Sequence, residues 1–69
     1  MSVSNSIKEY RKKMNLTQEE LAVCIKVTRQ TVIALEKGSY VPSLSLALDL
    51  AEFFKVPVEQ LFQKDKGEK

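Results

Sequence analysis

Two adjacent polar residues, Arg29 and Gln30, have side chains suited to recognising the edges of DNA bases. An arginine guanidinium can donate two hydrogen bonds to guanine O6 and N7, and a glutamine amide can pair with adenine N6 and N7. Ile33 and Ala34, about one helical turn further on, could contact a thymine methyl group. Most Arg-Gln pairs are simply exposed polar surface, so the interpretation depends on the element that presents them.

Enzymatic and metal chemistry find little support in the sequence. The chain contains no histidine and one cysteine, Cys24, which excludes a cysteine-histidine zinc site and an intramolecular disulfide. It has no glycine-rich phosphate loop, and its carboxylates stand where helix surfaces and caps would place them. We therefore expect neither an enzyme nor a bound metal or cofactor.

The length and composition of the chain fit one folded domain. It has 69 residues, of which 43% are hydrophobic and 29% charged, as in ordinary globular proteins. The apolar runs are only a few residues long and the N-terminus lacks an apolar signal segment, so we expect no membrane segment and a cytoplasmic location. The net charge of +2 is too small to identify a partner by itself.

The residues around Arg29 and Gln30 predict two short helices. Thr17 and Glu20 have the spacing of a capping box, which indicates that one helix begins at Gln18. Thr28 is a good N-cap for a second helix over 29–37, and Gly38 is a natural stop after it. The segment 27–33 is rich in β-branched residues and could be a strand on propensity alone, but these end signals favour a helix.

The three-residue connection 26–28 places the two helices at a steep angle, as in a helix-turn-helix. Val32 and Leu35 supply the buried stripe of the second helix, so its first turn presents Arg29 and Gln30 outward. Neighbouring polar residues could hold the DNA backbone without reading sequence. These are Gln18, Thr28, Thr31, Lys37, Ser39, Tyr40 and Ser43, although Tyr40 could equally anchor its loop.

Three further helices complete the prediction, so that every segment is helical. A first helix carries Ile7, Tyr10 and Met14 behind the candidate caps Ser4, Asn5 and Ser6, and Asn15 ends it. Ser43 caps a fourth helix that runs to about Phe54. Its apolar side chains occupy two faces, so we expect the helix to be buried nearly all round. One face carries Leu44, Ala47, Leu48, Ala51 and Phe54, and the other carries Leu46, Leu50 and Phe53. Pro57 begins a short fifth helix whose Val58, Leu61 and Phe62 return to the core.

The predicted architecture is therefore an all-α, compact five-helix domain with a helix-turn-helix. It occupies residues 1–69 as a single domain, with the folded core at 5–62 and a charged, frayed tail at 63–69.

The strings 16–22, 27–32, 35–38, 42–44 and 51–57 resemble the repressor/Cro-type helix-turn-helix regulators, the Xre family, over about residues 5–62. The resemblance implies a lambda-repressor-like DNA-binding domain, usually dimeric, that regulates transcription. It also implies DNA contacts at the positions of Gln18, Arg29, Gln30, Ile33 and Ala34. Members commonly pair an arginine near the end of the first helix with a glutamate that closes the third, and Arg11 and Glu36 stand at these positions.

Two departures from the family pattern affect the helix-turn-helix. Lys26 occupies the turn position usually held by glycine, where a left-handed backbone would cost a side chain about 1 kcal/mol. Val23 and Cys24 occupy outer positions that are often charged, and they are either partly buried under a neighbouring segment or part of a contact surface for a second protein.

The function predicted from the sequence is sequence-specific binding of double-stranded DNA and regulation of transcription, with repression the expected direction. One recognition helix reads too few base pairs for genomic specificity, so we expect a homodimer on a pseudo-palindromic operator. The expected dimer interface consists of Leu50, Phe53, Val58, Leu61 and Phe62. The alternative is a protein-binding helical module, such as an antitoxin-like or bridging partner.

Overall fold

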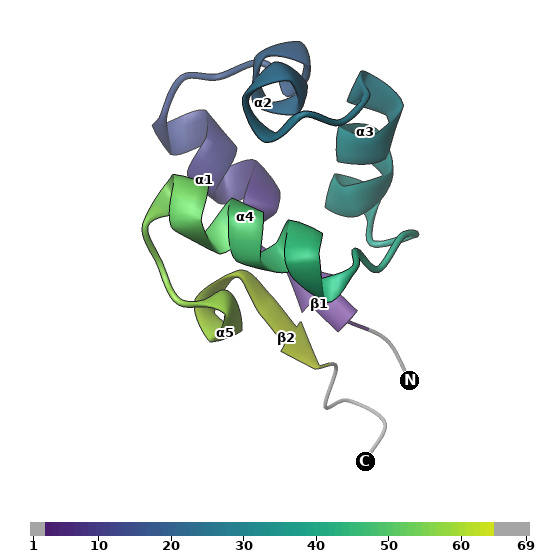
Figure 1. The fold of residues 1–69 in the computed structure, drawn as a ribbon, viewed down its shortest axis with the longest axis vertical. Helices are drawn as coiled ribbons and strands as arrows, with labels where there is room; N and C mark the ends of the chain where they lie inside the picture. The colour runs from purple at the N-terminus through teal and green to yellow at the C-terminus, as the bar shows by residue number, and fades with distance from the viewer. Residues whose placement is uncertain (1–2, 65–69) are drawn as a thin grey trace.

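The computed structural model describes residues 3–64, which form five helices and two short strands (Figure 1). In chain order the elements are β1 (Val3–Asn5), α1 (Ile7–Lys13), α2 (Gln18–Ile25), α3 (Arg29–Lys37), α4 (Leu44–Phe54), α5 (Val58–Leu61) and β2 (Phe62–Lys64). The five predicted helices and the mainly helical fold are confirmed. Within residues 3–64, no helix is long and apolar enough to cross a bilayer.

The helix ends follow local capping chemistry. The capping box of α2 is formed in both directions: Thr17 Oγ1 accepts from Glu20 N, and Glu20 Oε1 accepts from Thr17 N. Gly38 ends α3 in the left-handed conformation, at φ 80°. Because each of these signals acts within four residues, the sequence alone predicts the two helices of the helix-turn-helix to the residue.

A single core lies between the helices. Its fully buried side chains come from all five of them, and the largest are Ile7, Leu21, Val32, Leu35, Leu50 and Leu61. α2 packs chiefly on α3, and α4 lies against both α2 and α5 (Figure 1). The core therefore fixes the angle between α2 and α3.

The expectation that α4 is buried nearly all round is wrong. Leu44 is 72% exposed and Leu48 is 51% exposed, whereas Ala47, Leu50, Ala51 and Phe54 are buried. Leu44 and Leu48 lie four residues apart and share one edge of the helix, which no other element within residues 3–64 covers. Hydrophobic residues on both faces of a helix did not mean that both faces were packed.

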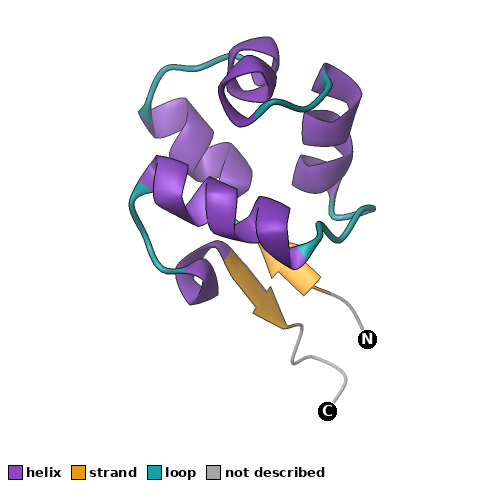
Figure 2. Cartoon of the chain, viewed as in Figure 1, coloured by secondary structure: helices purple, strands orange, loops and turns teal. Residues whose placement is uncertain are grey.

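Two strands that the helical prediction missed join the ends of the described chain (Figure 2). β1 pairs with β2 in antiparallel register, with Val3 opposite Lys64, Ser4 opposite Gln63 and Asn5 opposite Phe62. Gln63 and Lys64, expected in the tail, thus belong to β2, and the remaining tail residues 65–69 lie outside the described residues. Phe62 follows α5 as the first residue of this strand.

Candidate nucleic-acid interface

Helix α3 stands at the edge of the molecule, with one face held by the core and the other open (Figure 1). Val32 and Leu35 have no exposed surface, and they attach the inner face of α3 to the core. The turn before α3 begins with Lys26, whose backbone is left-handed at φ 63° and ψ 46°. The predicted strain at this position is therefore present.

The four residues predicted to read bases lie together on the outer side of α3. Arg29 and Gln30 are exposed, and Ile33 and Ala34 are partly exposed behind them. Among the hydrogen bonds within residues 3–64, neither the Arg29 guanidinium nor the Gln30 amide has a partner. Their donors and acceptors are free to pair with an external ligand.

The polar residues predicted to hold the DNA backbone surround α3. Ser43 Oγ accepts from Leu46 N at 3.2 Å, and Thr28 Oγ1 accepts from Thr31 N at 3.2 Å and lies 3.0 Å from Thr31 Oγ1. Ser39 Oγ donates to Ala34 O at 3.4 Å. These hydroxyls first serve as helix caps and loop bonds. Lys37, the last residue of α3, and Tyr40, in the loop after it, are both exposed.

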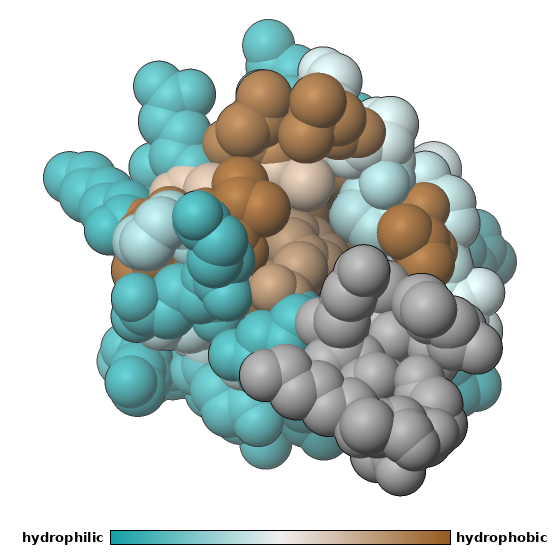
Figure 3. All heavy atoms as spheres, turned by 90° about the horizontal axis from the view of Figure 1, so that it is seen from below, coloured by the Kyte–Doolittle hydropathy of each residue, from teal (hydrophilic) through white to brown (hydrophobic). Residues whose placement is uncertain are grey.

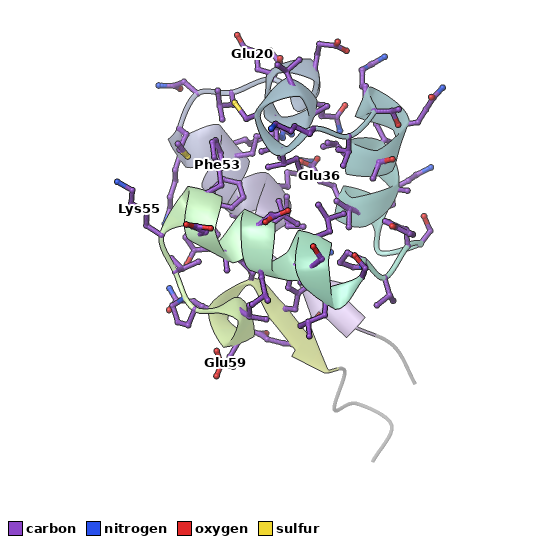
Figure 4. The ribbon with its side chains drawn as sticks, in the orientation of Figure 1. Glu20, Glu36, Phe53, Lys55 and Glu59 are labelled. Carbon is purple, nitrogen blue, oxygen red and sulfur yellow. The ribbon has the colours of Figure 1, made fainter. Side chains whose placement is uncertain are left out.

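A buried polar cluster ties α3 to α1 and α2. Arg11 Nε donates to Glu36 Oε2 at 2.6 Å and Nη2 donates to Glu36 Oε1 at 3.1 Å, so the predicted ion pair is confirmed and is bidentate. The two side chains are only 10% and 5% exposed, and Figure 4 places Glu36 on the inner side of α3. Arg11 Nη1 also donates to Leu16 O at 2.7 Å, and Gln18 Nε2 donates to Glu36 Oε1 at 3.1 Å. We call Arg11, Leu16, Gln18 and Glu36 the Glu36 cluster.

The charges in the Glu36 cluster stabilise one another. Burial by itself would raise the pKa of the Glu36 carboxyl, but hydrogen bonds from Arg11 and Gln18 and the nearby positive charges outweigh it, so this pKa is lowered. The hydrogen bond to Glu36 raises the pKa of Arg11 against the opposing effect of burial. Both groups are therefore charged at neutral pH. The contact of Gln18 with Glu36 was not predicted, because it joins residues 18 positions apart.

Val23 and Cys24 lie on the open side of α2. Val23 is 69% exposed and Cys24 is exposed, so the first of the two alternatives for these positions, partial burial under a neighbouring segment, is wrong for both. Beside them is a hollow of about 310 Å³ lined by Cys24, Ile25, Lys26, Asp49, Glu52 and Phe53. The end of α2 and the outer side of α4 form its walls.

The residues predicted for a dimer interface are divided by the structure. Leu50 and Leu61 are fully buried within one chain, so they cannot meet a second copy. Phe53 lines the hollow beside Cys24 and packs edge-on against Phe54, with ring centroids 5.2 Å apart. Val58 and Phe62 are partly exposed, and the exposed edge of α4 adds Leu44 and Leu48 to the available apolar surface.

Comparison with known proteins agrees with this geometry. The family model described as helix-turn-helix matches residues 7–61. An uncharacterized HTH-type transcriptional regulator from Methanocaldococcus jannaschii is 53% identical over 60 residues, which cover 87% of this chain and 91% of the relative. The transcriptional repressor RstR of the cryptic phage CTXphi from Vibrio cholerae is 40% identical over 58 residues, or 84% of this chain and 52% of the repressor.

Solved structures share the fold. The solution structure of the SOS-response transcriptional repressor LexA from Eubacterium rectale superposes with a TM-score of 0.77 and 30% sequence identity. The match covers 87% of this chain and 64% of that one.

Proposed function

Because the chain belongs to the repressor/Cro-type helix-turn-helix family of transcriptional regulators, we propose that it binds double-stranded DNA sequence-specifically with α3 in the major groove. Members of this family are not enzymes, as the sequence predicts. In the proposed complex Arg29 and Gln30 contact base edges, and Ile33 and Ala34 meet thymine methyl groups. We propose that the protein acts in the cytoplasm and that its binding represses transcription. Repression, as opposed to activation, is supported by the Vibrio cholerae relative, which is named a transcriptional repressor.

The observation that carries the proposal is the contrast between the two sides of α3. One side is fixed by the fully buried Val32 and Leu35, and the other presents Arg29 and Gln30 without partners among residues 3–64. An interface that reads bases needs donors that a fixed element presents and that no group of the protein already occupies. Gln18, Thr28, Thr31, Lys37, Ser39, Tyr40 and Ser43 are the proposed contacts to phosphate and sugar.

Selection of bound sites from a random duplex pool tests this function. We expect enrichment of a short motif with two related halves, and an affinity that falls steeply with salt concentration. Recovery of unenriched sequences after several rounds would contradict sequence-specific binding. Binding with no dependence on salt would contradict any contact with the DNA backbone.

We further propose that two copies bind together as a homodimer on a pseudo-palindromic operator. The supporting surface is apolar and runs from the edge of α4 at Leu44 and Leu48 to Val58 and Phe62. Figure 3, which views the molecule from the side of α5 and β2, shows hydrophobic residues gathered on this face. A twofold axis through such a patch buries it in both copies, and the two recognition helices then lie about 34 Å apart.

Sedimentation at micromolar concentration tests the dimer. The parent should sediment as two chains, and Leu44→Gln with Leu48→Gln should shift it toward one chain while helicity is retained. Val23→Gln is the matched control, because it removes an apolar side chain of similar exposure from α2. A parent that sediments as one chain and binds DNA one chain per site would contradict the dimer. Equal effects of the control would contradict the choice of surface.

A second candidate function, binding of another protein, is favoured by the hollow beside Val23 and Cys24. Apolar side chains from Ile25 and Phe53 and the carboxylates of Asp49 and Glu52 line it together. An antitoxin-like or bridging role predicts a stoichiometric partner that co-purifies with the chain, combined with weak, sequence-independent retention on duplex DNA. Salt-dependent retention on a selected duplex without such a partner favours the DNA-binding function instead.

A further inference from the structure

We propose that Glu36 is a positioning residue for DNA binding: it orients the Gln18 amide so that this side chain meets a phosphate already in its bound geometry. The inference rests on the proposed function. It assigns to the buried Arg11–Glu36 pair an effect on affinity that is separate from its effect on folding.

In the Glu36 cluster, each polar group is held in place by a hydrogen bond to the next group. The carbonyl of Leu16, just before α2, accepts from Arg11 Nη1 at 2.7 Å and holds the guanidinium. The guanidinium holds both carboxylate oxygens of Glu36, at 2.6 and 3.1 Å. Glu36 Oε1 then accepts from Gln18 Nε2 at 3.1 Å. The amide at the first position of α2 is therefore bonded directly to α3 through Glu36, and through Glu36 and Arg11 it is linked indirectly to α1.

The charge of Glu36 also decides which way the Gln18 amide points. A carboxylate only accepts hydrogen bonds, so the amide must present its nitrogen to Glu36 and not its oxygen. One N–H of this nitrogen is used by Glu36, and the second remains available to a phosphate oxygen. Gln18 is half-buried, so its outer part still reaches the surface at the start of α2. A neutral or missing group at position 36 would let the amide rotate.

Gln30 shows what an unattached glutamine looks like in the same motif. It also lies in the first turn of its helix, but it is exposed, and its amide has no partner within residues 3–64. A side chain that is ordered before binding loses less conformational entropy when it contacts DNA. Gln18 should therefore contribute more affinity than an exposed amide at the same place would.

A double-mutant cycle tests the coupling between the two residues. Gln18→Ala should weaken binding about tenfold, on a selected 20-base-pair duplex and on a scrambled one alike, without changing the salt dependence. Glu36→Ala should weaken binding several-fold in the parent, but no more than Gln18→Ala does, and less than twofold when Gln18 is already alanine. All affinities refer to the folded fraction, measured by circular dichroism.

Two further variants keep the test independent of folding. Arg11→Met with Glu36→Leu replaces the ion pair by apolar side chains, a change that buried pairs often tolerate, and it removes the acceptor for Gln18. It should fold and should show the same loss of affinity as Glu36→Ala. Gln60→Ala is the control, because Gln60 Nε2 donates to Tyr10 Oη at 2.6 Å in the Tyr10–α5 contact and not in the helix-turn-helix. It should leave affinity unchanged.

The dynamics of the free protein give a readout that needs no mutation. The Gln18 side-chain amide should show a heteronuclear NOE close to that of the α2 backbone, whereas the Gln30 amide should be mobile. A Gln18 amide as mobile as that of Gln30 would overturn the inference. So would a loss from Glu36→Ala that is equally large in the Gln18→Ala background, since a purely structural role is additive. If Arg29→Ala has no effect on affinity either, the proposed function itself fails.

Discussion

An arginine and a glutamine stand together at two places in this molecule, as Arg11 and Gln18 in the Glu36 cluster and as Arg29 and Gln30 on α3. In the first place both side chains are hydrogen-bonded to the same carboxylate, and the Arg11 side chain is 10% exposed. In the second place both are exposed and have no partner within residues 3–64. Identical residue types thus stand in opposite environments within one small domain.

The difference separates positioning from recognition. In a buried ion pair with a complete set of hydrogen bonds, separating the two partners leaves each charge buried and uncompensated. Such a pair therefore holds the helices that carry it in one arrangement. An exposed arginine contributes little to folding, and its guanidinium stays free for a ligand. The comparison therefore predicts that mutations in the Glu36 cluster act first on stability, whereas mutations on the outer face of α3 act only on DNA binding.

The largest expected effect is loss of stability when the ion pair is broken. Arg11→Ala or Glu36→Ala should lower the free energy of unfolding by roughly 3 to 5 kcal/mol, because the remaining charge is buried without its partner. The whole domain has a stability of only about 3 to 10 kcal/mol, so either variant approaches complete unfolding. Urea denaturation followed by circular dichroism measures the change.

Arg29→Ala is the matched control for this prediction. Its free energy of unfolding should stay within about 0.5 kcal/mol of the parent value. If Arg11→Ala unfolds at the parent's urea concentration and binds DNA weakly, Arg11 contacts phosphate and the first half of the comparison is wrong.

The next effect concerns affinity for DNA. Arg29→Ala and Gln30→Ala should each cost about 1 to 3 kcal/mol on the preferred duplex and relax the base preference at one position of each half-site. Lys55→Gln is the control for charge, since Lys55 points away from the body of the molecule on the side opposite α3 (Figure 4). Fluorescence anisotropy on preferred and scrambled duplexes measures both. Equal losses on the two duplexes would mean that Arg29 and Gln30 contact phosphates and do not read bases.

The two regions also differ in how far the sequence predicts them. The outer face of α3 follows from local signals, because Thr28 and Gly38 set the helix ends and the helical period places Gln30 on the side opposite Val32 and Leu35. The Arg11–Glu36 pair was expected only from a family resemblance. The bond from Gln18 to Glu36 joins two helices, and helical periodicity gives no information about side-chain contacts between elements.

The same limit explains the errors outside the site. The strands β1 and β2 are three residues each and pair across almost the whole chain, so no local pattern announces them. The hydrophobic side chains of Leu44 and Leu48, at helical spacing, predict a buried face. Whether an edge of a helix is covered depends on its neighbours, and within residues 3–64 this one is open.

A smaller effect on stability is expected in acid. The pKa of Glu36 is lowered in the folded state, so the carboxylate contributes stability that is fully present above its ordinary pKa of 4.5 and is lost as pH falls through the lower, folded value. Protonation leaves the carboxyl in place and able to hydrogen-bond, so the loss should be smaller than that from truncation. Urea denaturation of the parent and of Glu36→Gln should therefore give a difference in stability that shrinks below pH 4.5. A difference that stays constant would show that the charge of Glu36 is not stabilising.

The smallest expected effect lies at the turn between the two regions. Lys26 and Lys55 end α2 and α4 with nearly the same left-handed backbone, at φ 63° and ψ 46° and at φ 61° and ψ 43°. A side chain is disfavoured there, so Lys26→Gly and Lys55→Gly should each raise the free energy of unfolding by about 0.5 to 1 kcal/mol. If the strain at Lys26 is retained because its cation attracts DNA, Lys26→Gly alone should also lower affinity about twofold at low salt, with the effect vanishing at high salt. Thermal unfolding measures the stability of both variants, and fluorescence anisotropy on the same duplex measures their affinity. Equal gains in stability with unchanged affinity in both variants would show that Lys26 has only a structural role. Recognition would then be confined to the outer face of α3 and its flanking contacts.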